Sequence, residues 1–192
     1  MVSSQPFDYE ALFAKNAPVS TRGGNRHAKY DFAVAYPAPE TLPLDGLVEA
    51  LKVALDREGR DLAFYPVAAG LPALRQLVVE KLHRDRDMQV SIDDVVLTSG
   101  SGEALAMLIK ALTDPGDVVL TEEFVYLGTL RQLQLFGADV VGIQCDEQGL
   151  VIEDLEDTLK RLRGQGKQVK YLYTIPSFQN PMGWTMTLER RK

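Results

Sequence analysis

Apolar residues recur every three to four positions in several stretches of the chain, a spacing that places them on one face of a helix. In the stretch 44–58, for example, Leu47, Leu51 and Leu55 fall on one such face. Short continuous apolar runs stand between the later stretches, and such runs are typical of strands buried on both faces. The pattern predicts helices over 44–58, 71–85, 103–112, 125–136 and 153–163, and strands over 95–97, 118–121, 138–143 and 169–175.

Strands and helices alternate from residue 95 onward, and this order sets the fold class. A helix between two strands forms a crossover connection, which joins parallel neighbours. We therefore expect an α/β fold of three layers, with a mostly parallel sheet covered by helices on both faces. Ligands of such sheets bind beyond the carboxyl ends of the strands. The loops after residues 97 and 175 are thus the places to search for a site.

Residues 1–43 are irregular and are punctuated by glycine and proline. This composition predicts an extended arm with a short helix over about 9–15. The main domain then covers residues 44–192. We find no internal repeat and no low-complexity tract in the sequence.

The composition narrows the class of protein. The 192 residues include 21 Lys or Arg and 27 Asp or Glu, giving a net charge of -6, which argues against a nucleic-acid binder. The single cysteine, Cys145, excludes an internal disulfide, and with only two histidines no cluster has the spacing of a metal site. The opening stretch does not resemble a secretory signal, and no apolar run is long enough for a membrane span. We expect a cytoplasmic protein that does not contact membranes.

The sequence Gly100-Ser101-Gly102, placed between a predicted strand and a predicted helix, is compatible with an anion site. Small residues let backbone N–H groups approach an anion, and the positive end of the helix faces it. Two alternatives stand beside this interpretation. In the first, the glycines only turn the chain; in the second, Glu122, about 20 residues on, binds the ribose of a dinucleotide. Leu105 stands where the dinucleotide fingerprint needs its third glycine, which weakens the second alternative.

The loop 176–183 directly follows the last predicted strand. An Asn before Pro is held outside the helical region, so Asn180 would present a rigid amide donor at the ligand edge of the sheet. A plain turn is the alternative, because Asn-Pro is common in turns.

Taken together, these segments resemble the aminotransferase class I and II family, the fold-type I enzymes that use pyridoxal phosphate, and in particular its aminoadipate and kynurenine aminotransferase-like branch. The resemblance runs from about Tyr30 to the end of the chain. It is carried by the segments 65–66, 70–75, 98–105, 114–117 and 175–183 together with Tyr126.

The resemblance implies a role for particular residues. Ser101 and Gly102 match the positions that hold the phosphate of pyridoxal 5'-phosphate, and Tyr126 matches the aromatic that stacks on its ring. By spacing alone Tyr126 would be core, on a helix face with Leu130 and Leu133. Asn180 matches the amide that donates to the phenolic oxygen of the cofactor. Tyr65 matches a tyrosine that reaches the phosphate of a neighbouring subunit, so the resemblance implies a homodimer.

The chain departs from the family pattern in three places. The usual Gly-Ser-Gln-Gln reads Gly100-Ser101-Gly102-Glu103, so an acid stands near the phosphate and should point away or weaken binding. Glycines often found in the arm are replaced near Val34 and Ala35. The third departure is that the family's Schiff-base lysine, its ring-nitrogen aspartate and its substrate arginine have no counterpart. We therefore assign no catalytic residue.

We expect the N-terminal part of the large domain of a pyridoxal-phosphate transferase, inactive alone. The complete enzyme would exchange an amino group between an amino acid and a 2-oxo acid. One alternative is a transcription regulator with an aminotransferase-like effector-sensing domain, although about 30 residues before the matching region cannot hold a winged DNA-binding domain. A structural fragment without activity and a dinucleotide enzyme are two further candidates.

Overall fold

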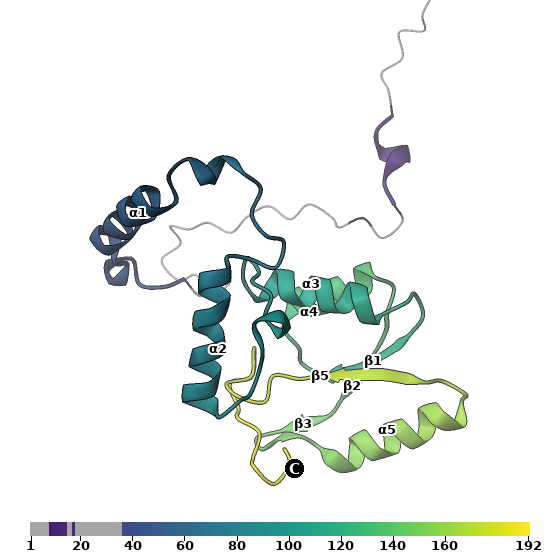
Figure 1. Ribbon diagram of the computed structural model, residues 1–192. Helices are drawn as coiled ribbons and strands as arrows, with labels where there is room; N and C mark the ends of the chain where they lie inside the picture. Colours follow the sequence, from purple (N-terminus) through teal and green to yellow (C-terminus); the bar gives the residue numbers. More distant parts are fainter. Residues whose placement is uncertain (1–7, 15–16, 18–35) are drawn as a thin grey trace, which may run out of the picture. The chain divides into compact units, whose positions relative to one another are not determined.

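A computed structural model describes residues 8–14, 17 and 36–192 of the chain (Figure 1). The described residues form two units, one made of residues 99–192 with 8–14 and 17, the other made of residues 36–98. In the first unit, the short helix predicted in the arm is a 3-10 turn, Glu10–Leu12. Val34 and Ala35 lie outside the described residues. Among the helices of the described ranges, none has both the length and the apolar character that a bilayer crossing needs.

The unit of residues 36–98 contains the two helices predicted there. Helix α1, Leu44–Glu58, ends at Gly59, whose positive φ of 54° suits a residue without a side chain. Helix α2, Pro72–Arg86, begins with proline at its first turn, where the missing N–H costs nothing. Three short 3-10 segments complete this unit: Pro39–Thr41, Gly59–Ala63 and Ile92–Asp94.

The strand predicted over 95–97 is wrong. The segment is extended but joins neither sheet of the described residues, and Leu97 N–H donates to the carbonyl of Ala69 instead. The apolar character of Val95 has another cause. Its side chain is buried in this unit, and its carbonyl accepts a hydrogen bond of 2.7 Å from Nε of the buried Arg75. Val96, the next residue of the run, is exposed, so the apolar run contains only one buried side chain and does not mark a strand.

The other unit contains a parallel sheet with the strand order β2-β1-β5 (Figure 1). β1, Val118–Glu122, pairs with β2, Asp139–Ile143, on one side and with β5, Val169–Tyr173, on the other. The predicted α/β class and the parallel arrangement are therefore confirmed. The helices of this unit are α3, Ser101–Leu112, α4, Leu127–Leu135, and α5, Ile152–Gly164.

Helices cover both faces of this sheet, as a three-layer fold requires (Figure 1). All five residues of β1 are buried, and the side chains of its three apolar residues alternate between two cores. Val119 packs with Ile109 of α3 and Leu133 of α4 on one face. Leu120 packs with Leu162 of α5 on the other. The central strand thus anchors both outer layers.

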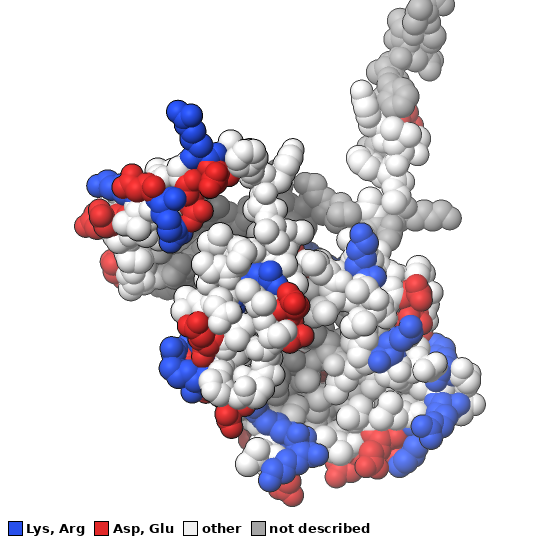
Figure 2. Space-filling view, viewed as in Figure 1, with Lys and Arg blue, Asp and Glu red and all other residues white. Residues whose placement is uncertain are grey.

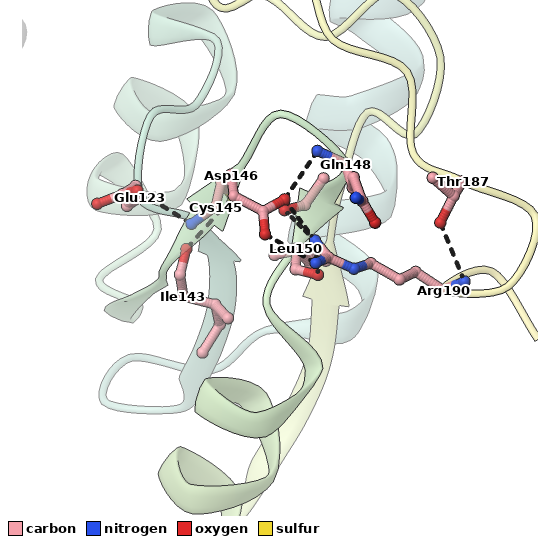
Figure 3. A network of polar contacts seen from close by, with 9 residues as sticks. Glu123, Ile143, Cys145, Asp146, Gln148, Leu150, Thr187 and Arg190 are labelled. Atoms are coloured by element: carbon pink, nitrogen blue, oxygen red, sulfur yellow. Dashed lines mark hydrogen bonds and ion pairs between the residues drawn. The ribbon is translucent and has the colours of Figure 1, made fainter.

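A small hairpin that the sequence pattern did not predict follows β2. Its strands β3, Cys145–Asp146, and β4, Gly149–Leu150, have two residues each. Figure 3 shows the guanidinium of Arg190 beside Asp146 and Leu150 of this hairpin. The guanidinium donates to both carboxylate oxygens of Asp146, at 2.6 and 2.7 Å, and to the carbonyls of Gly149 and Leu150. This ion pair ties the hairpin to the segment around residue 190.

One face of the described residues mixes charges of both signs. On the face seen in Figure 2, basic and acidic side chains lie next to one another over both units. The exposed ends of α5 follow the helix dipole, with Glu153 and Asp154 in the first turn and Arg161 and Arg163 in the last. This face therefore lacks the basic stripe that a nucleic-acid binder presents.

Candidate functional site

A hollow of about 570 Å³ lies within the sheet unit, at the carboxyl end of β5. Its walls include Ser101 at the start of α3, Tyr126 just before α4, Tyr173 and Ile175 at and beyond the end of β5, and Asn180 in the loop that follows. Three of the five residues singled out from the sequence, Ser101, Tyr126 and Asn180, therefore meet at one place. This is the sheet edge at which a ligand was predicted.

The start of α3 borders the hollow with small residues. Gly100 precedes the helix with a φ of 86° and has no side chain to cap it. Ser101 is the first residue of this 12-residue helix and lines the hollow. Gly102 lies in the same turn, and a Cβ atom added to it would meet nothing within 4 Å. The positive end of a helix, bordered by small residues, is therefore open to an anion.

Tyr126 forms an aromatic wall rather than part of the core. Helix α4 begins at Leu127, so Tyr126 is the residue before it, and its side chain is 46% exposed. The prediction from spacing that Tyr126 shares a buried face with Leu130 and Leu133 is wrong, because the helix starts later than the predicted residue 125. Of these three residues, only Leu133 is fully buried.

Asn180 stands on a loop that returns on itself. Main-chain hydrogen bonds join Met186 N–H to the carbonyl of Pro176, at 2.8 Å, and Gln179 N–H to the carbonyl of Trp184, at 2.9 Å. The guanidinium of Arg191 donates to the carbonyls of Pro176 and Met186. The Asn180–Pro181 peptide bond is cis. The hydrogen bonds of the main chain and of Arg191 fix both ends of the loop that carries the Asn180 amide.

Tyr65 belongs to the unit of residues 36–98. Its side chain is fully exposed, between the 3-10 segment that ends at Ala63 and helix α2. Tyr65 does not line the hollow, whose lining residues all lie in the other unit.

Glu122 is not an acid for a ribose. Its side chain is 0% exposed, and its carboxylate accepts hydrogen bonds from Thr174, Ile175 and Gln179. The strand that the dinucleotide motif needs before its glycines is also missing, since residues 95–97 join no sheet of the described chain. The dinucleotide interpretation therefore loses both of its structural requirements.

Glu103 does not point away from the start of α3. Its Oε2 accepts a hydrogen bond of 2.5 Å from the N–H of Ser99, so the side chain folds back along the first turn. The contact resembles a capping box, in which an acid in the first turn accepts a hydrogen bond from a backbone N–H that has no partner within the helix. It also leaves a negative charge beside the turn that carries Ser101 and Gly102.

The arrangement can hold a flat ring that carries an anionic group. The helix start would take the anion, the Tyr126 ring would face the flat surface, and the Asn180 amide would donate to a ring oxygen. Across the described part of the chain, no lysine lines the hollow and no group of His, Cys, Asp or Glu is placed to hold a metal ion. Sequence reasoning missed Gln179, a buried neighbour of Asn180, because a glutamine in a turn gives no signal of burial.

A parallel sheet between two helical layers, with a hollow at its carboxyl edge, defines an α/β protein of the class that binds ligands at that edge. The chain belongs to the aminotransferase class I and II family, whose model matches residues 36–191.

Known relatives agree with this membership. The aromatic-amino-acid aminotransferase 1 of Thermococcus litoralis is 36% identical over 156 residues, which cover 81% of this chain and 37% of that protein. The solved kynurenine aminotransferase of Pyrococcus horikoshii, in complex with PMP, is 32% identical with a TM-score of 0.79, covering 96% of this chain and 47% of the other.

Two further relatives matter for the cofactor and for the regulator alternative. The solved α-aminoadipate aminotransferase of Thermus thermophilus, complexed with N-(5'-phosphopyridoxyl)-L-leucine, is 29% identical with a TM-score of 0.76, covering 96% of this chain and 46% of the other. An uncharacterized HTH-type transcriptional regulator of Bacillus subtilis is 29% identical over 163 residues, which cover 84% of this chain and 35% of that protein.

The chain thus spans less than half the length of each of these relatives. Family membership, together with the solved relatives complexed with PMP and a phosphopyridoxyl compound, implies pyridoxal 5'-phosphate as the cofactor.

Proposed function

We propose that the complete protein is a pyridoxal-phosphate-dependent aminotransferase that moves an amino group between an amino acid and a 2-oxo acid. The observation that carries the proposal is the hollow bordered by Ser101, Tyr126 and Asn180 together. A helix start, an aromatic ring and an amide are three groups that match the phosphate, the ring and the phenolic oxygen of this cofactor. The family membership of the chain supports the same activity.

The phosphate is assigned to the first turn of α3. The Ser101 hydroxyl and the N–H groups of this turn, including that of Gly102, would donate to the phosphate oxygens. Gly102 suits this role because the absent side chain leaves space for a close backbone approach. The carboxylate of Glu103 opposes the phosphate charge from the same turn.

The ring is assigned to Tyr126 and Asn180. The exposed face of Tyr126 offers a stacking surface, and the amide of Asn180 would donate to the phenolic oxygen and favour its ionised form. When bound, the cofactor supplies the electron-withdrawing ring that amino-group transfer needs. The protein residues supply orientation and charge.

Three further predictions from the sequence become part of the proposal. We propose that residues 1–43 form an arm, that residues 44–192 belong to the cofactor-binding large domain, and that the protein is a homodimer. The full exposure of Tyr65 leaves it available to a partner subunit, where it would reach the phosphate. A cytoplasmic location and the inactivity of residues 1–192 by themselves stay predictions.

An effector-sensing domain of a transcription regulator is the alternative, supported by the relative from Bacillus subtilis. Such a domain could bind the cofactor through the same residues. Amino-group transfer with turnover would favour the enzyme, whereas cofactor-dependent binding of the complete protein to DNA without turnover would favour the regulator.

The test uses the complete protein with pyridoxal 5'-phosphate. The names of the relatives suggest aromatic amino acids, kynurenine and 2-aminoadipate as donors, with 2-oxoglutarate as the acceptor. We expect a cofactor absorbance band and transfer from at least one donor. Absence of both the band and turnover would contradict the proposal.

A further inference from the structure

Glu122, the last residue of β1, is a fully buried carboxylate. Its side chain is 0% exposed. Among the ion pairs formed by the described residues, none includes Glu122. Burying a carboxylate is costly unless hydrogen-bond donors compensate for the lost water. The position of its donors therefore indicates what the residue holds in place.

Three donors from the later part of the chain converge on this carboxylate. Oε1 accepts from the Thr174 hydroxyl at 2.6 Å and from the Ile175 N–H at 2.8 Å. Oε2 accepts from the side-chain amide of Gln179 at 2.7 Å. Ile175 lines the hollow, and Thr174 precedes it. One carboxylate thus joins the end of the central strand to the end of β5 and to the loop that follows.

Gln179 is itself fixed at every polar group. Its side chain is 2% exposed; Nε2 also donates to the carbonyl of Phe124, and Oε1 accepts from Met182 N–H at 2.8 Å. Its main-chain N–H donates to Trp184, and its carbonyl accepts from Gly183 N–H. A residue held by both its side chain and its backbone leaves the next residue little freedom of direction.

The next residue is Asn180, which lines the hollow. We propose that Glu122 is a positioning residue that acts through Gln179 to aim the Asn180 amide at the cofactor. Glu122 does not line the hollow, so it would touch neither the cofactor nor the substrate. The inference rests on the proposed function, because it takes the ligand of the hollow to be pyridoxal 5'-phosphate.

Glu122→Gln is the sharpest substitution, because it keeps the shape of the side chain while it removes the charge and replaces one acceptor oxygen by a donor NH₂ group. If the new amide oxygen accepts from Thr174 and Ile175, the new NH₂ group faces the NH₂ group of Gln179. Turning the Gln179 amide over would place its NH₂ group against Met182 N–H and its oxygen against the carbonyl of Phe124. At least one hydrogen bond of the loop is lost in either case.

The readout is the absorbance of pyridoxal 5'-phosphate bound to the complete protein, followed as a function of pH. An amide donor to the phenolic oxygen favours the ionised form, so weakening it raises the pH midpoint. We expect Asn180→Ala to raise the midpoint by about one unit and Glu122→Gln by about half a unit. We also expect each variant to weaken cofactor affinity about threefold to tenfold.

The double variant separates positioning from general stability. If Glu122 acts through Asn180, then Glu122→Gln adds no further shift of the midpoint in the Asn180→Ala background. Glu123→Gln is the matched control. Glu123 is the next residue, and its carboxylate accepts from Cys145 N–H in the hairpin rather than from the donors that meet Glu122. It should leave the midpoint unchanged.

The outcomes distinguish the two proposals. A midpoint unchanged by Asn180→Ala overturns the assignment of the hollow. A midpoint shifted by Asn180→Ala but not by Glu122→Gln, or shifted equally by Glu122→Gln in both backgrounds, overturns the positioning role and leaves the hollow assigned. If Glu122→Gln does not fold, Gln179→Met removes the same link, and the same criteria apply.

Discussion

The ring of Tyr126 lies directly over Gly128, so that a Cβ atom added to Gly128 would be only 2.8 Å from Cζ of the tyrosine. No real Cβ contact is that short, and the ring would have to move. Gly128 lies in the first turn of α4, and its φ is not among the positive glycine values. The glycine is therefore needed for the position of its neighbour's ring and not for its own backbone.

Gly128→Ala should displace the Tyr126 ring from the hollow. We expect the affinity for pyridoxal 5'-phosphate to fall about tenfold, as for the loss of an aromatic contact. The fold should persist, because alanine favours a helix more than glycine does. Fluorescence titration of the complete protein measures the affinity. Gly164→Ala is the control, since nothing lies within 4 Å of that site; equal affinities for both variants would contradict the role of Tyr126.

Gly102→Val should separate ligand binding from folding. The added side chain meets no protein atom within 4 Å of its Cβ but would occupy the space assigned to the phosphate. We expect cofactor affinity to fall at least about tenfold, since charge-assisted hydrogen bonds are lost. The Tm without cofactor should change little. Gln168→Ala, on the exposed surface, serves as the control; unchanged affinity of the valine variant would place the phosphate elsewhere.

Glu103→Gln should strengthen cofactor binding. The amide oxygen can still accept from Ser99 N–H, while the charge that repels the phosphate is removed. Because the site is exposed and screened, we expect a gain of about threefold at low salt that shrinks as ionic strength rises. Titrations at two salt concentrations measure it. Glu156→Gln in α5 should show no gain; weaker binding by the Glu103 variant would reverse the interpretation.

Asp146→Asn should make stability less dependent on pH. The hydrogen bonds from Arg190 hold the pKa of the Asp146 carboxyl below its ordinary value of 3.8. A lowered folded-state pKa stabilises the fold above the unfolded-state value, and this contribution is lost as the pH falls through the folded-state value. The variant should therefore melt at a lower Tm at pH 7, and the difference should vanish well below pH 3.8. Asp157→Asn, whose exposed carboxylate pairs with Lys160 on the same helix, is the control. A difference that persists in acid would contradict the assignment.

Cys145 should react slowly with alkylating reagents. Burial, assisted by nearby acids, raises the pKa of its thiol to about 11. At pH 8 only about one thiol in a thousand would then be ionised, against roughly a quarter for an ordinary cysteine. Iodoacetamide labelling of the folded protein should be much slower than that of the same protein in guanidinium and should accelerate up to pH 11. Equal rates in both states would show that the thiol is not shielded.

The helices were predictable because their apolar spacing is a local property. α1 was predicted at both ends, since Pro43 and Gly59 mark its limits. Strand pairing depends on distant residues, and this explains the error at 95–97, where the carbonyl of the buried Val95 accepts from Arg75 and the segment joins no sheet of the described residues. The hairpin at β3 and β4 was missed because a strand of two residues has no periodicity.

The residues that line the candidate site were predictable, but the buried residues that hold them in place were not. Ser101 and Asn180 follow from the rule that ligands bind at one edge of a parallel sheet. Gln179 did not stand out, because its burial depends on Glu122, a residue 57 positions earlier. Glu122 suggested a ribose for the same reason: an acid at the end of a strand gives no sign of the donors that the fold brings to it.

The bonds of Glu122 also constrain the order in which the protein can be completed on the ribosome. Its donors stand 52, 53 and 57 residues later in the chain, beyond α4, β2 and α5. Until those residues leave the exit tunnel, burial of the end of β1 would leave the Glu122 carboxylate without these hydrogen-bond donors. We therefore expect the carboxyl end of β1 to stay hydrated in the nascent chain through the synthesis of two further helices, and to become buried only when residues 174–179 arrive.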